Sequence, residues 1–158
     1  VKSVMLVLSD REIVGSAVRL DEPGPILHVC EGIETALAVR LLVQQPVWAC
    51  LVANLLESVA IPPHVRFIGI WGDMDLKGAG QRVTTSLATR LRSEGRRAIA
   101  ILPPPFVPVG SKGIDWLDVV GSLGVDAIRR MSFFTRLMQT IGASASHDEL
   151  VRGQPHAV

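Results

Sequence analysis

Two aspartates lie one residue apart, directly after an apolar stretch that has the character of a buried strand. The acids are Asp73 and Asp75, and the segment reads FIGIWGDMDLKGAG. Like charges a few ångströms apart repel each other, and each carboxylate also loses hydration on burial, so this placement needs a compensating interaction. A divalent cation is the usual compensation. The spacing therefore predicts a magnesium or manganese site.

Acidic residues follow two other apolar stretches in the same way. Glu31 comes directly after ILHVC, and Asp115 and Asp118 follow RRAIAIL and a proline-rich loop. If these stretches are strands of one parallel sheet, the loops after them meet at one edge, and the acids converge there. Carboxylates of this kind suit Mg²⁺ or Mn²⁺, which hold and neutralise phosphate oxygens during phosphoryl transfer.

Helix capping is the alternative explanation for each acidic pair. Asp73 and Asp75 could cap the helix expected after them, and Asp115 and Asp118 could begin another helix. For any one pair considered alone we favour capping. Three acidic positions at the same edge of one sheet favour a metal site.

Alternating strand and helix patterns surround these acids. Apolar residues run continuously in the four segments expected as strands, 26–30, 47–52, 65–71 and 96–102. Such continuous runs are typical of a parallel sheet that helices cover on both faces. Helices are expected at 33–44, 79–93 and 125–141, with short helical segments within 53–63 and 114–124. We expect an α/β fold with an open, mainly parallel sheet of about four strands flanked by helices.

The two ends of the chain differ from this core. Residues 3–9 and 15–20 read as two short strands around a charged turn, which predicts an N-terminal β-hairpin over residues 3–20. Residues 142–158 are small and polar and are expected to form a flexible tail. Residues 1–141 would then form one domain with its core at 26–120.

The composition is that of one globular domain. The 158 residues are enough to enclose a core, and 48% of them are hydrophobic against 20% charged. The formal net charge is only +1. Affinity for nucleic acid would therefore depend on where Lys and Arg lie, because the total charge does not favour it.

The cysteines indicate a reducing setting. Cys30 and Cys50 lie inside apolar runs and are expected to be core residues. The chain shows no zinc-ligand spacing, no disulfide framework and no signal peptide, so a cytoplasmic location is expected. Its apolar segments are too short to cross a bilayer, so no membrane partner is expected. Because the chain starts at Val1 without a methionine, we expect it to be part of a longer protein.

Four motifs occur in an order that resembles a known family. They are CEGIETALAV, PVWACLVANL, IGIWGDMDLKGAGQRVTTSLATRLRSEGRRAIAILPP and DWLDVV. Together they resemble the Toprim domain, the Rossmann-like catalytic module shared by bacterial-type primases, type IA and II topoisomerases and some nucleases. The resemblance covers roughly residues 15–120. It is strongest to the primase-like subfamily of phages, plasmids and other mobile elements, whose members carry an EGIETALA signature.

The resemblance implies a role for each acid. Glu31 matches the Toprim glutamate, which acts in acid or base chemistry, and Asp73 with Asp75 matches the aspartates that coordinate Mg²⁺. Asp115, with Asp118 as a further candidate, matches the later acidic element of primases. By this likeness Glu31, Asp73 and Asp75 are the catalytic residues, and Asp115 joins them as a metal ligand.

Basic residues follow the aspartates closely. Solvation of a helix surface explains most of them, and we expect Lys77 and Arg82 to lie near enough to the acids to bind phosphate. Lys112 precedes Asp115 and is a third candidate for contact with a nucleotide or nucleic acid, although a solvated loop lysine is the alternative.

The resemblance favours a magnesium-dependent nucleotidyltransferase of the DNA primase type. Such an enzyme joins nucleoside triphosphates into an RNA primer on a single-stranded DNA template, and it works with helicase or other replication domains of its parent protein. One alternative is a Toprim nuclease that uses the same acids to activate water. Another is a non-catalytic scaffold that binds DNA or protein without a metal.

Overall fold

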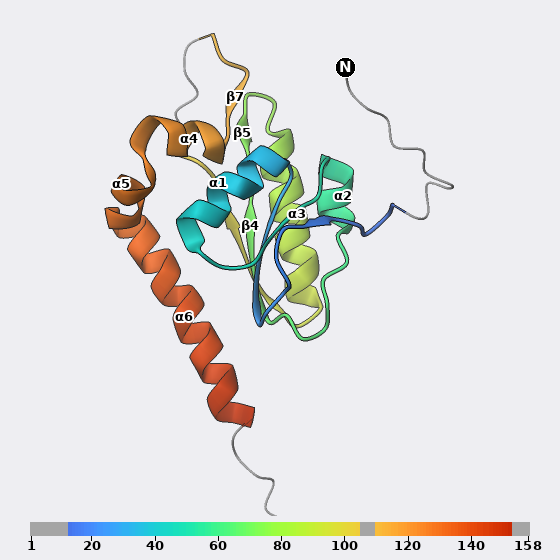
Figure 1. Ribbon diagram of the computed structural model, residues 1–158. Coiled ribbons are helices and arrows are strands. Elements are labelled where there is room, and N and C mark those ends of the chain that lie inside the picture. The colour runs from blue at the N-terminus through green and yellow to red at the C-terminus, as the bar shows by residue number, and fades with distance from the viewer. Residues whose placement is uncertain (1–12, 105–109, 153–158) are drawn as a thin grey trace, which may run out of the picture.

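The computed structural model of the chain describes residues 13–104 and 110–152, with side chains through residue 143. A five-stranded sheet in the order β1-β3-β2-β4-β6 lies at the centre of the molecule (Figure 1). Its strands are β1 (Val18–Arg19), β2 (Ile26–Cys30), β3 (Val47–Ala49), β4 (Phe67–Trp71) and β6 (Arg97–Ile101). Strands β3, β2, β4 and β6 run parallel, and β1 pairs antiparallel with β3 at one edge. The expected α/β fold with four parallel strands is confirmed.

Helices cover both faces of this sheet (Figure 1). One face is covered by α2 (Ala53–Ser58) and α3 (Ala79–Ser93). The other face is covered by α1 (Ile33–Val43), α4 (Trp116–Leu123), α5 (Val125–Arg130) and α6 (Ser132–Arg152). Both faces of the central strands are therefore buried, which explains why their sequences are apolar almost without interruption.

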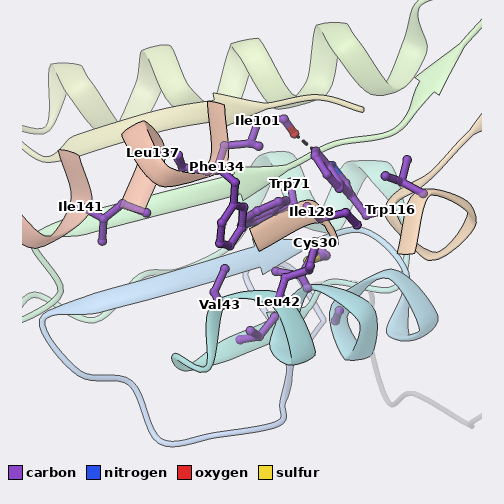
Figure 2. Close-up of a cluster of buried hydrophobic side chains, with 14 of the residues drawn as sticks. Cys30, Leu42, Val43, Trp71, Ile101, Trp116, Ile128, Phe134, Leu137 and Ile141 are labelled. Atoms are coloured by element: carbon purple, nitrogen blue, oxygen red, sulfur yellow. Dashed lines mark hydrogen bonds between the residues drawn. The ribbon is translucent and has the colours of Figure 1, made fainter. Parts of the chain in front are cut away.

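Strand β4 shows how one apolar run serves two cores. Ile68 and Ile70 belong to the cluster beneath α2 and α3. Phe67 and Trp71 point to the opposite cluster, where the buried face of α6 packs (Figure 2). The side-chain period of two thus divides one continuous run between two hydrophobic layers. Because β4 is fixed on both faces, the acids that follow it start from a rigid position.

The histidine of β2 is a neutral core residue. Trp71 donates its indole N–H to Nδ1 of His28 at 2.9 Å, so the imidazole hydrogen lies on Nε2, which is 2.8 Å from Oε1 of Gln45. Burial lowers the pKa of His28 to about 4. Gly69 lies beside His28 in the register of β2 and β4, and a side chain there would collide with the imidazole ring.

Several local expectations differ from the structure. The strand expected at residues 15–20 is only Val18–Arg19, and its expected hairpin partner at 3–9 lies outside the described residues. The helix expected at 125–141 is divided into α5 and α6 at Met131, whose ψ of 138° is extended. Helix α6 continues to Arg152, through residues that we expected to form a tail.

A second, two-stranded ribbon was not predicted. It pairs β5 (Met74–Asp75) antiparallel with β7 (Gly113–Ile114) and lies beyond the main sheet (Figure 1). Between β6 and β7, residues 105–109 of the proline-rich loop lie outside the described part of the chain. Within the described residues, no helix is long and apolar enough to span a bilayer.

Candidate functional site

The acids meet where the main sheet and the ribbon join. Glu31 follows β2, Asp73 follows β4 after one glycine, and Asp75 is the last residue of β5. The ribbon pairs Met74 with Ile114, and continuing this antiparallel register places Asp73 opposite Asp115. The carboxylate charges of Glu31, Asp75, Asp115 and Asp118 all act on Asp73. These acids therefore lie close enough together for the charges of the other four to act on Asp73.

Asp73 is the least satisfied acid of this group. Burial, followed by the charges of the neighbouring carboxylates with Asp115 first among them, raises the pKa of its carboxyl to about 7. Its Oδ1 atom is buried and has no hydrogen-bond partner. A buried acceptor without a donor is costly, since the water it has lost is not replaced. Asp73 thus lies in a position where a cation would be stabilising.

Asp75, two residues later, has the opposite environment. Its carboxylate accepts hydrogen bonds from the backbone N–H groups of Lys77 at 2.9 Å, Ala79 at 3.2 Å and Gly80 at 2.7 Å. These bonds hold the pKa of Asp75 below its ordinary value, Gly80 contributing most. Gly78, the N-cap residue of α3, offers no side-chain acceptor. Asp75 therefore serves as the cap of α3 and stays ionised.

Glu31 lies half-buried beside the turn between β3 and α2. Burial raises the pKa of Glu31, the charge of Asp75 adds to this, and a hydrogen bond from the backbone N–H of Ala53 opposes it. Ala53 is the first residue of α2, whose N-cap residue, Val52, makes no side-chain capping bond. A carboxylate from another strand thus occupies the place of a capping side chain.

Asp115 and Asp118 form a capping box at the start of α4. The Asp118 N–H donates to Asp115 at 2.8 Å, and the Asp115 N–H donates to Asp118 at 3.2 Å. The capping explanation therefore holds for these two acids and for Asp75. It does not hold for Asp73, and it does not exclude a second role for the others, because their charges still act on Asp73.

Two glycines let the backbone pack against the paired aspartates. A Cβ atom at Gly80 would lie 2.6 Å from the carbonyl oxygen of Asp73, and one at Gly113 would lie 2.7 Å from the carbonyl oxygen of Met74. Both distances are too short for a side chain. Helix α3 and strand β7 can approach the acids this closely only because these positions lack side chains.

The three expected basic residues gather around the turn between β5 and α3. Lys77, Arg82 and Lys112 are all exposed. Arg82 donates to the carbonyl oxygen of Lys77 at 2.8 Å, and the N–H of Leu76 donates to the carbonyl oxygen of Lys112 at 3.2 Å. The ribbon pairing therefore brings Lys112 beside residues about 35 positions earlier in the chain, which sequence order alone does not indicate.

Two residues that are close to the acids in the sequence do not join the site. Trp116 is fully buried, with its ring 4.8 Å from that of Trp71, so it fills the core and is not available to stack on a base. Glu34 is exposed on the first turn of α1, and it is not among the acids whose charges act on Asp73.

The donor chemistry suits magnesium, although the ligands are not gathered as a closed cage. Among the described residues, no three His, Cys, Asp or Glu side chains are close enough to hold a metal ion by themselves. Mg²⁺ usually keeps several waters and binds one or two protein carboxylates together with substrate phosphates. The unpaired oxygen of Asp73, with Glu31 and Asp115 nearby, fits that mode of binding. The catalytic and metal-binding roles of these acids remain predictions.

Comparison with known families identifies the fold. The family model described as the Toprim domain matches residues 26–126. The chain belongs to the Toprim family. This membership implies a magnesium-dependent function on nucleic acid, of the kind carried out by primases, nucleases and topoisomerases. No curated protein and no solved structure was found to match the chain.

Reasoning from the sequence missed one contributor to the site. The backbone N–H of Ala53 holds the Glu31 carboxylate, yet Ala53 has no functional side chain. The available signal was indirect: α2 begins without a Ser, Thr, Asp or Asn at its N-cap, so its first donors need an acceptor from elsewhere.

Proposed function

We propose that this Toprim domain is the catalytic part of a primase-like protein and transfers nucleotidyl groups on nucleic acid with Mg²⁺. The observation that carries the proposal is the buried, unpaired oxygen of Asp73 among four other carboxylates. Holding these charges together without a cation is unfavourable, so the site is suited to a metal and the phosphates that the metal brings.

The residues would divide the work by their environments. Asp73 would bind the metal directly, with Asp115 and ionised Asp75 supplying negative charge nearby. Glu31, whose pKa is raised, would exchange a proton with the attacking hydroxyl group. The metal, when bound, would neutralise phosphate oxygens as charge develops on them.

The exposed basic residues would bind the strand and the triphosphate. Lys77, Arg82 and Lys112 surround the turn beside Asp75 and could reach phosphates that lie over the acids. The proposed substrates are nucleoside triphosphates and a single-stranded DNA template. The parent would be a cytoplasmic protein of a mobile element, in which helicase or other replication domains accompany this one.

Incubation with a labelled single-stranded template, the four ribonucleotides and Mg²⁺ tests the proposal. New oligoribonucleotides that fail to form with Asp73→Asn are the expected result. Shortening of the DNA without new oligomers would replace the primase with a Toprim nuclease. Absence of both products, together with no binding of Mn²⁺ by calorimetry, would indicate a scaffold that binds nucleic acid or protein without catalysis.

A further inference from the structure

The turn between β3 and α2 contains a leucine in an unusual backbone conformation. Leu51 has a φ of 70°, in the left-handed region that favours glycine and asparagine. Gln44 is the other described non-glycine residue with positive φ, and it lies at the C-terminal cap of α1, where this conformation is common. Leu51 lies at no helix C-terminus, so its conformation needs another explanation.

Packing of the Leu51 side chain does not supply that explanation. The side chain is 49% exposed and belongs to neither hydrophobic cluster. An unfavourable backbone conformation persists only where surrounding interactions impose it, and such positions are frequent at functional sites. The interactions in this turn are made by the backbone.

Those backbone bonds connect the turn to Glu31. The Cys50 N–H donates to the carbonyl oxygen of Cys30 at 2.9 Å and continues the pairing of β3 with β2. The Leu51 N–H donates to the carbonyl oxygen of Glu31 at 2.7 Å, and the Val52 N–H turns back to the carbonyl oxygen of Cys50 at 2.9 Å. The chain then enters α2, and the N–H of Ala53 meets the carboxylate of Glu31.

We propose that Leu51 is a positioning residue, whose left-handed backbone conformation aims the Ala53 N–H at the Glu31 carboxylate and so fixes Glu31 toward the other acids. Two bonds hold Glu31 in this arrangement, one to its backbone carbonyl group and one to its side chain. The effect of Leu51 on metal binding rests on the proposed function, whereas the contact between Ala53 and Glu31 can be measured without metal or substrate.

Substitutions at residue 51 separate backbone conformation from side-chain chemistry. Leu51→Gly and Leu51→Asn remove the apolar side chain and still favour the left-handed conformation. Leu51→Val keeps an apolar side chain, but its branched Cβ strongly disfavours that conformation. Leu41→Val is the control. Leu41 is 61% exposed and lies near the C-terminal end of α1, at the end of the strands opposite the acids.

The amide signal of Ala53 in ¹⁵N-labelled protein reports the hydrogen bond directly. We expect Glu31→Gln and Leu51→Val each to shift this signal, and Leu51→Val to make its hydrogen exchange about tenfold faster. Leu51→Gly, Leu51→Asn and Leu41→Val should keep the wild-type signal. Calorimetry should show that Leu51→Val binds Mn²⁺ about tenfold more weakly than wild type. Leu51→Gly, Leu51→Asn and Leu41→Val should keep the wild-type affinity.

Two results would overturn the inference. One is an unchanged Ala53 signal in Leu51→Val. The other is a loss of Mn²⁺ affinity in Leu51→Gly as large as in Leu51→Val, which would assign the role to the exposed side chain. Wild-type protein that binds no Mn²⁺ would contradict the proposed function instead, and the Ala53 signals would still decide whether Leu51 positions Glu31.

Discussion

Asp73 and Asp75 are separated by one residue and have opposite electrostatic environments. Three backbone N–H groups at the start of α3 satisfy Asp75 and lower its pKa. No hydrogen bond satisfies the buried oxygen of Asp73, and its pKa is raised to about 7. Adjacent carboxylates with separated pKa values are suited to different roles. We therefore expect Asp75 to hold the local structure of the site and Asp73 to bind a cation.

Asp73→Asn should give the largest effect on function. We expect a loss of at least ~100-fold in metal-dependent activity, because the variant loses a ligand and more distant partners already cost 10- to 100-fold. The same substitution should stabilise the metal-free protein at pH 8 by about 2 kcal/mol, since it removes a buried, repelled charge that solvent only partly screens. Denaturant unfolding with and without Mg²⁺ measures the stability of the metal-bound and the metal-free protein.

The pH dependence of stability checks the sign of this effect. The folded-state pKa of Asp73, about 7, lies above its unfolded value of 3.8, so the folded protein binds the extra proton between these values. The contribution of protonated Asp73 is complete below about pH 4 and is lost as pH rises toward 7. A wild-type curve that runs parallel to that of Asp73→Asn over this range would contradict the raised pKa.

Gly80→Ala should give the next largest effect, this time on the fold of the site. Its Cβ would collide with the carbonyl oxygen of Asp73, and we expect destabilisation of about 2 kcal/mol in spite of the better helix propensity of alanine. Gly121→Ala in α4 is the matched control, because its Cβ would meet no atom within 4 Å. Equal unfolding midpoints for the two variants would show that the close approach of α3 to Asp73 is wrong.

Asp75→Asn should change stability in the opposite direction from Asp73→Asn. The neutral amide loses the charge that attracts three N–H groups at the start of α3, so the melting temperature at pH 7 should fall. Because the folded-state pKa of Asp75 is lowered, its contribution is present above pH 3.8 and is lost as pH falls below that value. The difference from wild type should therefore shrink in acid, and a thermal melt series from pH 3 to pH 7 measures it.

Lys77→Ala should give the smallest effect. Loss of one phosphate contact should reduce the affinity for single-stranded DNA a few-fold and lower the slope of log affinity against log salt by about 1. Arg97→Ala is the control, since Arg97 is exposed at the first residue of β6, at the end of the parallel strands opposite the acids. Fluorescence anisotropy over a salt series distinguishes them, and equal slopes for both variants would remove Lys77 from the interface.

The sequence predicted the elements with strong periodic signals. Helix α3 spans Ala79–Ser93 as expected, and β2 and β4 lie within the expected apolar runs, because burial on both faces imposes a continuous pattern. The ribbon of β5 and β7 was missed, since strands of two residues carry no periodicity. Because the ribbon was not predicted, the pairing that places Asp115 opposite Asp73 was not predicted either.

The residue types of the site were predictable, but their separate roles were not. The sequence placed the acids at one edge, yet it could not show that α3 satisfies Asp75 and leaves Asp73 without a partner. Backbone N–H groups make the difference between the two acids. Because nearly every residue has such a group, the sequence does not show which acid they contact. The same reason hid the contact of Ala53 with Glu31.

Titration of the aspartate side-chain carboxyl carbons by ¹³C NMR tests the central claim most directly. In metal-free protein, Asp73 should titrate with a midpoint near pH 7 and Asp75 below 3.8. Addition of Mg²⁺ should move the Asp73 midpoint several pH units lower, since a bound cation favours the ionised form. Ordinary midpoints for both acids, or an Asp73 midpoint that Mg²⁺ leaves unchanged, would contradict the account.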